Sequence, residues 1–462
     1  MYQAYILNAL KRHQAKNPLS AHMPGHKNGA IVAENLRTAW GSDIFRYDIT
    51  ELEGMDDLHH PSGIIAQSQK QAAEIFHAKE ACYLINGSTV GLHAALLSAA
   101  RGEEIFIPRH CHRSVYYGLM LAQAKPVFLP ITLDPVWGIP LGVAPTDLKK
   151  AISAHPNCHN LLIVNPTYHG ISWQNSDLMK IAKENNLTVI VDEAHGAHLS
   201  FHPALPPSML SLDADLVIQS WHKTLPALTG SSCLLIGENY RGNDVNIALD
   251  ILQSTSPSYL MLSALESAAI YMAEHGESDI AASLDEIALL NEEIFRLETI
   301  QALQNPHWHQ DPFKLNLSSR ALSGAELAQK LAAHQIYVEM SEANSVLLLL
   351  PLKITPAYRE ALVSALSEID ASCLTLPERT LIAPFYLPQV PPKSVSLAAA
   401  LWQEKKAVPL AEAEGAISAE FLLKYPPGIP IALPGEIITA EIVELLRRDG
   451  NFAAINVLKT NT

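Results

Sequence analysis

The chain has 462 residues, of which 48% are hydrophobic, and a net charge of −15. This length can bury a large core and predicts two or three domains. The acidic balance argues against nucleic acid as a partner, because that affinity rests on basic contacts to phosphate. The negative charge would attract cationic small molecules, or it would serve only to keep the protein soluble. No apolar run approaches the roughly 20 residues that span a bilayer, so we expect no membrane association.

The cysteines and the N-terminus indicate a cytoplasmic protein. Five cysteines are scattered along the chain, and none forms a C-x-x-C pair. Such usage is typical of a reducing compartment and predicts no disulfide framework. The first 17 residues have the period of a short amphipathic helix and lack the pattern of a secretory signal.

Strand-like and helix-like segments alternate between about residues 60 and 240. This alternation predicts an α/β domain with a mostly parallel sheet. Its strands are continuous apolar runs, which indicates a sheet buried on both faces. The predicted helices are 63–79, 89–100 and 112–124, and the predicted strands are 81–85, 103–108, 125–131, 160–166, 187–192, 214–220 and 231–237.

The pattern changes after about residue 305, beyond two long predicted helices at 258–276 and 279–300. Shorter strands then mix with helices, which predicts a smaller α+β domain. A proline-rich linker at 386–395 divides this domain near residue 390. We therefore expect an N-terminal arm at 1–55, a large domain at 56–300 and a small domain at 301–462. The predicted small-domain strands are 313–319, 345–352 and 380–387, and its helices are 324–335 and 356–369.

Polar residues follow several strands of the large domain, where parallel sheets bind their ligands. Ser88 and Thr89 begin a helix, where their hydroxyls and free N–H groups make either an anion cup or an ordinary cap. Asp192 ends an apolar strand, and a buried carboxylate needs a cation or donors. Lys223 follows the next strand. A desolvated lysine is a nucleophilic amine, although most lysines keep their head in water.

The combination of anion cup, carboxylate and amine matches the needs of pyridoxal phosphate. That cofactor takes a phosphate anchor, a partner for its protonated pyridine nitrogen and a Schiff-base lysine. The alternative is a metal site made by Asp192, His195, His198 and His202. Against it, the sequence lacks an H-E-x-x-H motif, and a metal site would leave Lys223 without a role. Two histidines that flank Cys111 offer a further, weaker metal alternative.

With these residues in place, the sequence resembles the ornithine/lysine/arginine decarboxylase family of fold-type-I pyridoxal-phosphate enzymes, in its short bacterial form. The resemblance covers nearly the whole chain. The motifs that carry it are HMPGHKNG (22–29), DITELEGMDDLHHPSG (48–63), INGSTVG (85–91), RHCHRS (109–114), VDEAHGAH (191–198), SWHKTLPALTG (220–230), STSPSY (254–259) and YPPGIPIALPGE (425–436).

The resemblance implies decarboxylation of arginine, lysine or ornithine to carbon dioxide and the corresponding polyamine-type amine. Arginine is favoured by analogy with the short-form enzymes alone. The enzyme is expected to be a homodimer or a larger homo-oligomer. Its fold would be the aspartate-aminotransferase-like large domain with a mostly parallel sheet, plus a small C-terminal α+β domain. The rivals are an aminotransferase or aldolase of the same fold type, a metal-dependent hydrolase and a non-catalytic homologue.

The resemblance also implies roles for individual residues. Lys223 would be the Schiff-base lysine, and Asp192 would pair with the pyridine nitrogen. His195 would lie near the reacting end of the substrate, and either it or Lys223 would return a proton to Cα. The remaining cofactor residues implied are His112 and Ala194 on the two ring faces, Ser88, Thr89, Ser220 and His222 at the phosphate, and Thr255 at the phosphate held in the partner subunit.

Contacts to the substrate are less specific in the sequence. Glu436, the acidic residues of 48–57 and His26 in the N-terminal arm are the candidates for the substrate side. The carboxylates would either face a cationic side chain or be solvated or structural. Two departures from the family pattern bear on these contacts: Lys424 replaces a proline before YPPGIP, and the C-terminal domain is short.

Overall fold

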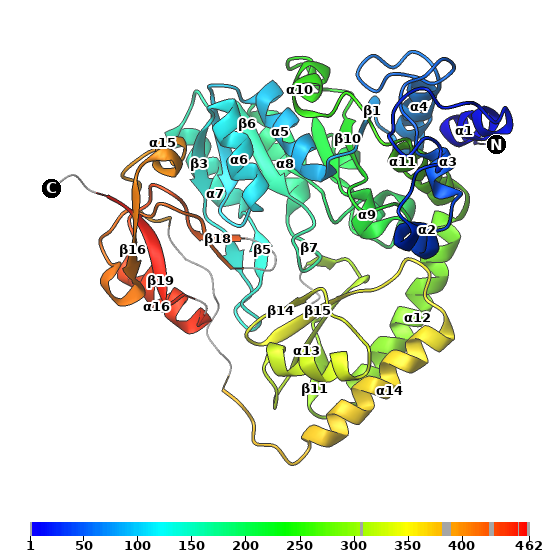
Figure 1. Ribbon diagram of the computed structural model, residues 1–462. Coiled ribbons are helices and arrows are strands. Elements are labelled where there is room, and N and C mark those ends of the chain that lie inside the picture. Colours follow the sequence, from blue (N-terminus) through cyan, green and yellow to red (C-terminus); the bar gives the residue numbers. More distant parts are fainter. Residues whose placement is uncertain (1, 305–307, 381–389, 425–428, 451, 460–462) are drawn as a thin grey trace. The chain divides into compact units, whose positions relative to one another are not determined.

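The computed structural model describes all residues except 1, 305–307, 381–389, 425–428, 451 and 460–462. The chain divides into two compact units (Figure 1): unit 1 contains Met1–Ala99 and Thr188–Ser283, and unit 2 contains Ala100–Leu187 and Leu284–Thr462. The predicted strand 380–387 and part of the predicted linker fall outside the described residues. The domain boundaries expected near 55 and 300 stay a prediction.

The strands of unit 1 lie in the order β1-β10-β9-β8. β8 and β9 run parallel, with Asp192 level with Ile218, while β10 is antiparallel to β1 and to β9. Because both faces of β9 and β10 are buried, their sequences are continuous apolar runs rather than alternating ones. The four predicted strands are confirmed, as β1 (Glu80–Leu84), β8 (Thr188–Asp192), β9 (Leu216–Gln219) and β10 (Ser232–Ile236).

Helix α5 (Gly87–Ala99) begins three residues after β1 and packs against β1, β9 and β10. A Cβ at Gly91 would lie 2.6 Å from Leu84 Cδ1, so glycine permits this close approach of helix to sheet. The predicted N-terminal helix is confirmed as α1 (Tyr5–Ala15). Unit 1 also contains α2 (Glu34–Trp40), α3 (Ile44–Tyr47), α4 (Ile64–Phe76), α9 (Trp221–Thr224), α10 (Val245–Leu252) and α11 (Tyr259–Tyr271).

Unit 2 contains three parallel strands in the order β6-β2-β3. Helix α6 (Arg113–Ala122) follows β2 after four residues, as the apolar pattern predicts. Short strands at β4 (Thr132–Leu133), β5 (Pro140–Gly142) and β7 (Ile171–Ser172) were not predicted, because two- or three-residue strands leave no periodic signal. The other elements here are β2 (Glu104–Pro108), β3 (Lys125–Leu129), β6 (Asn160–Val164), α7 (Pro145–Ala154) and α8 (Asn175–Glu184).

A four-stranded antiparallel sheet with the order β11-β13-β15-β14 follows in unit 2. Helix α13 packs against β13 and β15 and contacts α14. This antiparallel sheet with helices is the α+β pattern that the sequence predicts. Helix α12 (Glu277–Phe295) begins in unit 1 and ends in unit 2. The elements that follow it are β11 (Ile300–Ala302), β12 (His309–Gln310), β13 (Lys314–Ser319), α13 (Gly324–Ala333), β14 (Met340–Ser341), β15 (Ser345–Leu349) and α14 (Pro356–Cys373).

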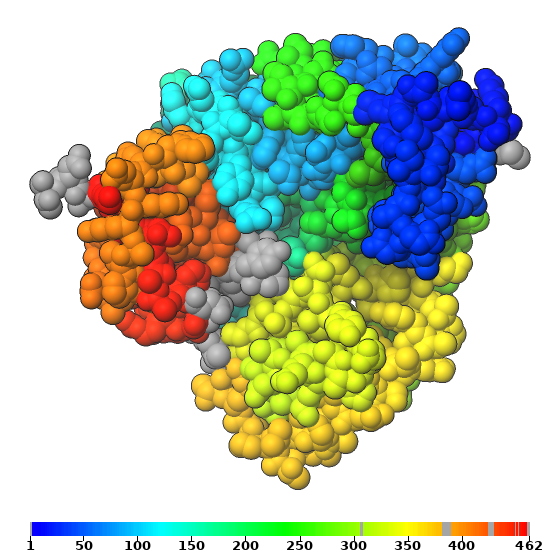
Figure 2. All heavy atoms as spheres, in the orientation of Figure 1, coloured from blue at the N-terminus to red at the C-terminus, as the bar shows by residue number. Residues whose placement is uncertain are grey.

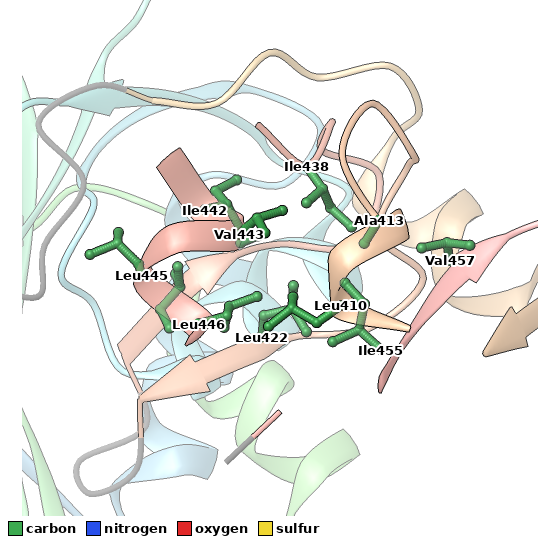
Figure 3. Packing of buried hydrophobic residues seen from close by; sticks show 12 residues of the cluster. Leu410, Ala413, Leu422, Ile438, Ile442, Val443, Leu445, Leu446, Ile455 and Val457 are labelled. Atoms are coloured by element: carbon green, nitrogen blue, oxygen red, sulfur yellow. The ribbon is translucent and has the colours of Figure 1, made fainter. Parts of the chain in front are cut away.

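The last 70 residues have a hydrophobic core of their own (Figure 3), in which α16 packs with its neighbouring strands. Within the described part of the chain, no helix is long and apolar enough to cross a bilayer. The elements of this segment are α15 (Leu397–Trp402), β16 (Lys405–Pro409), β17 (Leu422–Lys424), β18 (Ile429–Ala432), α16 (Ala440–Asp449) and β19 (Ala454–Leu458).

Candidate active site

The carboxyl ends of β8 and β9 bring the predicted site residues of unit 1 to one edge of the strands. Asp192 is the last residue of β8 and is level with Ile218, two residues before Ser220. The short helix α9 then carries Lys223. β10 starts at this same edge because it is antiparallel to β9. The local sequence therefore places a carboxylate, a hydroxyl and an amine together at the end of two neighbouring strands.

Lys223 Nζ lies 3.1 Å from Nε2 of His195. Asp192 is buried, and Ala194 N–H donates to its Oδ1 at 3.2 Å. Desolvation raises the pKa of the Asp192 carboxyl, while the Lys223 charge and the Ala194 N–H oppose that rise. A nearby cation would stabilise the ionised form of a carboxylate that is buried in this way. The site thus offers an anionic partner for a protonated ring nitrogen.

Two hydroxyls meet where α5 begins. Ser220 Oγ donates to Ser88 Oγ at 2.7 Å. Thr89, in the first turn of α5, is exposed. Gly87 has φ of +74°, and its N–H donates to the Gly230 carbonyl at 2.9 Å, so the turn before the helix is fixed. Hydroxyls at a helix N-terminus form an anion cup, which fits the phosphate role expected for these residues.

His222 is held differently from what a simple phosphate ligand requires. Its backbone N–H and its Nδ1 both donate to the carbonyl of Ser231, at 3.1 and 2.8 Å. Desolvation lowers its pKa, the Ser231 hydrogen bond opposes that shift, and the Lys223 charge lowers the pKa further. Nε2 is therefore the nitrogen left to meet a phosphate, and it can donate only after taking up a proton.

His112, in unit 2, caps the N-terminus of α6. Its Nδ1 accepts from the Ser114 backbone N–H at 3.2 Å and lies 2.8 Å from Ser114 Oγ. Because Nδ1 accepts the backbone hydrogen, the neutral ring carries its proton on Nε2. The cap fixes the plane of the imidazole, which suits a ring that stacks on another.

Glu436 has a different partner from the one that we expected. Both of its carboxylate oxygens accept from Arg109, with Nη1–Oε1 and Nη2–Oε2 distances of 2.7 Å, and both side chains are buried. Oε2 also accepts the Leu433 backbone N–H at 2.7 Å. These bonds place the carboxylate in a structural ion pair, and the substrate contact expected for Glu436 stays a prediction. The sequence had left this structural alternative open.

The acidic loop also has internal partners. Asp56 accepts backbone N–H groups from Ser62, Gly63 and Ile65, among others, and these bonds outweigh desolvation and lower its pKa. Asp48 lies 3.2 Å from Nε2 of His26. Asp56 is therefore a structural carboxylate rather than a substrate contact. Thr255, by contrast, lies at a cavity of about 440 Å³ in unit 1, which is lined by Glu51, Asp57, His59, His60, Asp250 and Thr255.

Sequence reasoning missed two contacts made by residues of the quoted motifs. Arg109 stood in a quoted motif without a role, and its partner is 327 residues away. The carbonyl of Ser231, which orients His222, has no side-chain signal at all. For the metal alternative, no group of three or more His, Cys, Asp or Glu residues within the described ranges is placed to hold an ion.

Comparisons with known proteins identify the family of this chain. The family model for the Orn/Lys/Arg decarboxylase major domain matches residues 5–314, and the model for the C-terminal domain matches 383–453. An arginine decarboxylase of Halalkalibacterium halodurans is 33% identical over 97% of this chain and 93% of its own length. The uncharacterized protein YaaO of Bacillus subtilis is 36% identical over 96% and 93%. The inducible lysine decarboxylase of Escherichia coli is 23% identical over 94% and 75%.

Solved structures share the fold. The constitutive lysine decarboxylase of E. coli aligns with a TM-score of 0.85 and 19% identity, covering 99% of this chain and 82% of that one. A serine palmitoyltransferase of Sphingomonas wittichii aligns with a TM-score of 0.57 and 12% identity, covering 81% and 86%. The expected fold class is therefore confirmed, and the chain belongs to the Orn/Lys/Arg decarboxylase family and is an amino-acid decarboxylase.

Proposed function

We propose that this protein binds pyridoxal phosphate and decarboxylates arginine. The observation that carries the cofactor assignment is the cluster in unit 1, where the Lys223 amine, the buried Asp192 carboxylate and the Ser88–Ser220 hydroxyl pair lie at one edge of the sheet. An amine, a carboxylate and an anion cup are the groups that this cofactor requires. Desolvation raises the pKa of Asp192, and a nearby cation would offset that cost of keeping the carboxylate ionised.

The residues would divide the work as follows. Lys223 would hold the cofactor aldehyde, Asp192 would keep a proton on the ring nitrogen, and Ser88, with Ser220, would bind the phosphate. Pyridoxal phosphate, when bound, supplies an electron sink for the pair left behind by the departing carboxylate. His195 Nε2 and Lys223 Nζ lie within hydrogen-bond distance of each other, so both atoms are candidates for delivering a proton to Cα.

Arginine as the substrate is supported by the relatives. Arginine decarboxylases of H. halodurans and B. subtilis are 33% and 32% identical over 93% of their own lengths. The lysine decarboxylase of E. coli is only 23% identical and considerably longer than the matched region. Asp56 and Glu436 already have hydrogen-bond partners within the protein, so the other acidic residues of 48–57 are the better candidates for binding a guanidinium.

We also propose a homodimer. The N-terminal arm lies at the surface of the molecule, where it is dark blue in Figure 2. Three of its large apolar side chains are exposed, Leu19 by 95%, Ile31 by 71% and Trp40 by 62%. Exposed apolar groups concentrated on one segment are typical of an interaction surface. A second copy of the chain would cover them, and Thr255 would reach the phosphate in that partner subunit.

The test is product analysis on the purified protein loaded with pyridoxal phosphate. We expect carbon dioxide and the corresponding amine from arginine, with lower rates from lysine and ornithine. Lys223→Ala should lose both the visible absorbance of the lysine-bound cofactor and the carbon dioxide release. A keto acid product without carbon dioxide would instead indicate an aminotransferase, and release from lysine alone would overturn the substrate assignment.

A further inference from the structure

The buried ion pair between Arg109 and Glu436 joins two distant parts of unit 2. Its two parallel hydrogen bonds of 2.7 Å fix both the distance and the orientation of the guanidinium. Arg109 Nη2 also donates to the Ile431 carbonyl at 3.3 Å, and its guanidinium carbon lies 5.1 Å from the centre of the Phe128 ring. Only 7% of the Arg109 side chain and 3% of the Glu436 side chain are exposed. If either side chain moved away, the other charge would be left buried and unpaired.

The Glu436 end of the pair is rigid because three separate segments of the C-terminal region meet there. Ser418 N–H donates to the Glu436 carbonyl at 2.8 Å, and Lys393 forms an isolated bridge with Glu436. Gly435 has φ of +90°, and a Cβ there would lie 2.2 Å from the Val395 carbonyl oxygen, so only glycine fits. Ile438, two residues on, belongs to the hydrophobic cluster of this segment (Figure 3).

The Arg109 end lies three residues before His112, and the intervening chain is tightly held. Tyr116 Oη donates to the Arg109 carbonyl at 2.9 Å. Cys111 Sγ contacts the Pro108 carbonyl at 3.1 Å, and the His112 ring accepts the Ser114 N–H. Consecutive Cα atoms are 3.8 Å apart. A shift of Arg109 therefore displaces the cap of α6 and the imidazole with it.

Holding the C-terminal segment in place does not by itself explain why a charged pair is used here. An apolar contact of the same size would hold the C-terminal segment equally well or better, since burying two charges is costly. What a bidentate pair adds is a fixed geometry at one point. That point is next to the segment 110–114 rather than in the centre of the C-terminal hydrophobic cluster.

We propose that Arg109 and Glu436 are positioning residues for the cofactor site: the C-terminal segment sets the place of His112 through this ion pair. The inference rests on the proposed function and on the role that the family resemblance implies for His112, on one face of the cofactor ring. The C-terminal segment thereby acts on cofactor affinity without contacting the cofactor.

The experiment compares Glu436→Gln with the wild-type protein. Glutamine keeps the size and one acceptor but removes the charge and the second matched acceptor. We expect the dissociation constant of pyridoxal phosphate, measured by equilibrium dialysis, to rise at least about tenfold. In the cofactor-free protein, the amides of Ser114 and Val115 should exchange hydrogen faster. If Glu436→Gln fails to fold, Arg109→Lys keeps the charge, loses the bidentate geometry and should shift both readouts in the same direction.

The matched control is Glu286→Gln. Glu286, on α12, also accepts a hydrogen bond from an arginine, since Arg359 Nε on α14 lies 2.8 Å from its Oε2. This ion pair joins α12 to α14 rather than to the segment 110–114. This variant should leave cofactor affinity and the exchange of residues 110–115 unchanged. A cofactor affinity in Glu436→Gln equal to that of this control overturns the inference.

A double-mutant cycle with His112→Ala separates this inference from the proposed function. If Glu436 acts through His112, Glu436→Gln should not weaken cofactor binding further in the His112→Ala background. Additive effects in the cycle overturn the positioning role. If His112→Ala alone leaves cofactor affinity unchanged, the proposed site assignment of His112 fails, and the inference fails with it.

Discussion

Lys223 Nζ and His195 Nε2 lie 3.1 Å apart, within hydrogen-bond distance. When Lys223 is an ammonium group, Nε2 must supply the lone pair, and the imidazole is then neutral with its proton on Nδ1. His195 stands three residues after Asp192, within the same short loop that follows β8. The local chain thus brings an acid, a base and an amine into one site.

We expect His195→Ala to lower kcat by about 10²- to 10⁴-fold, the usual contribution of a positioned acid or base. The visible absorbance of the lysine-bound cofactor should remain, because Lys223 is intact. Steady-state kinetics and a spectrum of the same sample check both points. A kcat within threefold of the wild-type value would leave Lys223 as the proton donor.

Asp192→Asn should separate cofactor binding from stability. Desolvation raises the pKa of this carboxyl, so at neutral pH the ionised group costs the cofactor-free fold free energy, and that cost vanishes at pH values below the unfolded pKa of about 3.9. We expect the variant without cofactor to melt no lower than the wild type at pH 8. Its cofactor affinity should fall about 10- to 100-fold, as for one charge-assisted hydrogen bond. Undiminished affinity would contradict the pyridine-nitrogen role.

His59 makes the loop at the 440 Å³ cavity sensitive to pH. Nδ1 lies 2.9 Å from Asp250 Oδ1 and Nε2 lies 3.0 Å from the Ser254 carbonyl, and since both partners only accept, the ring must carry both protons. Burial lowers the pKa of His59, but these hydrogen bonds and the Asp250 and Asp57 charges together raise it.

A raised histidine pKa stabilises the fold fully below about pH 6.5 and loses that effect as the pH rises through the folded value. We therefore expect His59→Gln to destabilise the protein by on the order of 1 kcal/mol at pH 6 and by less at pH 9. Urea unfolding at the two pH values measures the difference. Equal losses at both would show that His59 acts as a neutral ring; the exposed His334→Gln serves as a control.

We expect His110 to lower the free energy of unfolding as the pH becomes acidic. It is fully buried, and desolvation, helped by nearby His169, lowers its pKa to about 4. Because the unfolded chain takes up a proton near pH 6.5 and the folded chain does not, stability falls as the pH drops from about 6.5 to 4. We expect a loss of about 2 kcal/mol between pH 7 and pH 5 from this group. His110→Gln should reduce that loss, whereas His155→Gln, which replaces a half-exposed histidine, should not.

The elements of the fold could largely be located from the sequence. Apolar runs such as 187–192 and 214–220 become β8 and β9, because residues buried on both faces must be apolar at every position. Asp192 and Lys223 could be identified as candidate site residues for a related reason. Asp192 ends one buried strand and Lys223 closely follows the next, and the carboxyl ends of parallel strands meet at one edge.

The hydrogen-bond and ion-pair partners of the candidate residues could not be derived from the sequence in this way. Nothing in the local sequence of Glu436 distinguishes a carboxylate that faces a substrate from one that pairs with Arg109, 327 residues earlier. The carbonyl that orients His222 belongs to Ser231, and every residue has such a carbonyl. The sequence by itself determined which chemical groups stand at the strand ends, because local periodicity is written into the chain. Only the tertiary structure decided their partners, because pairing between distant segments depends on how the packed elements bring them together.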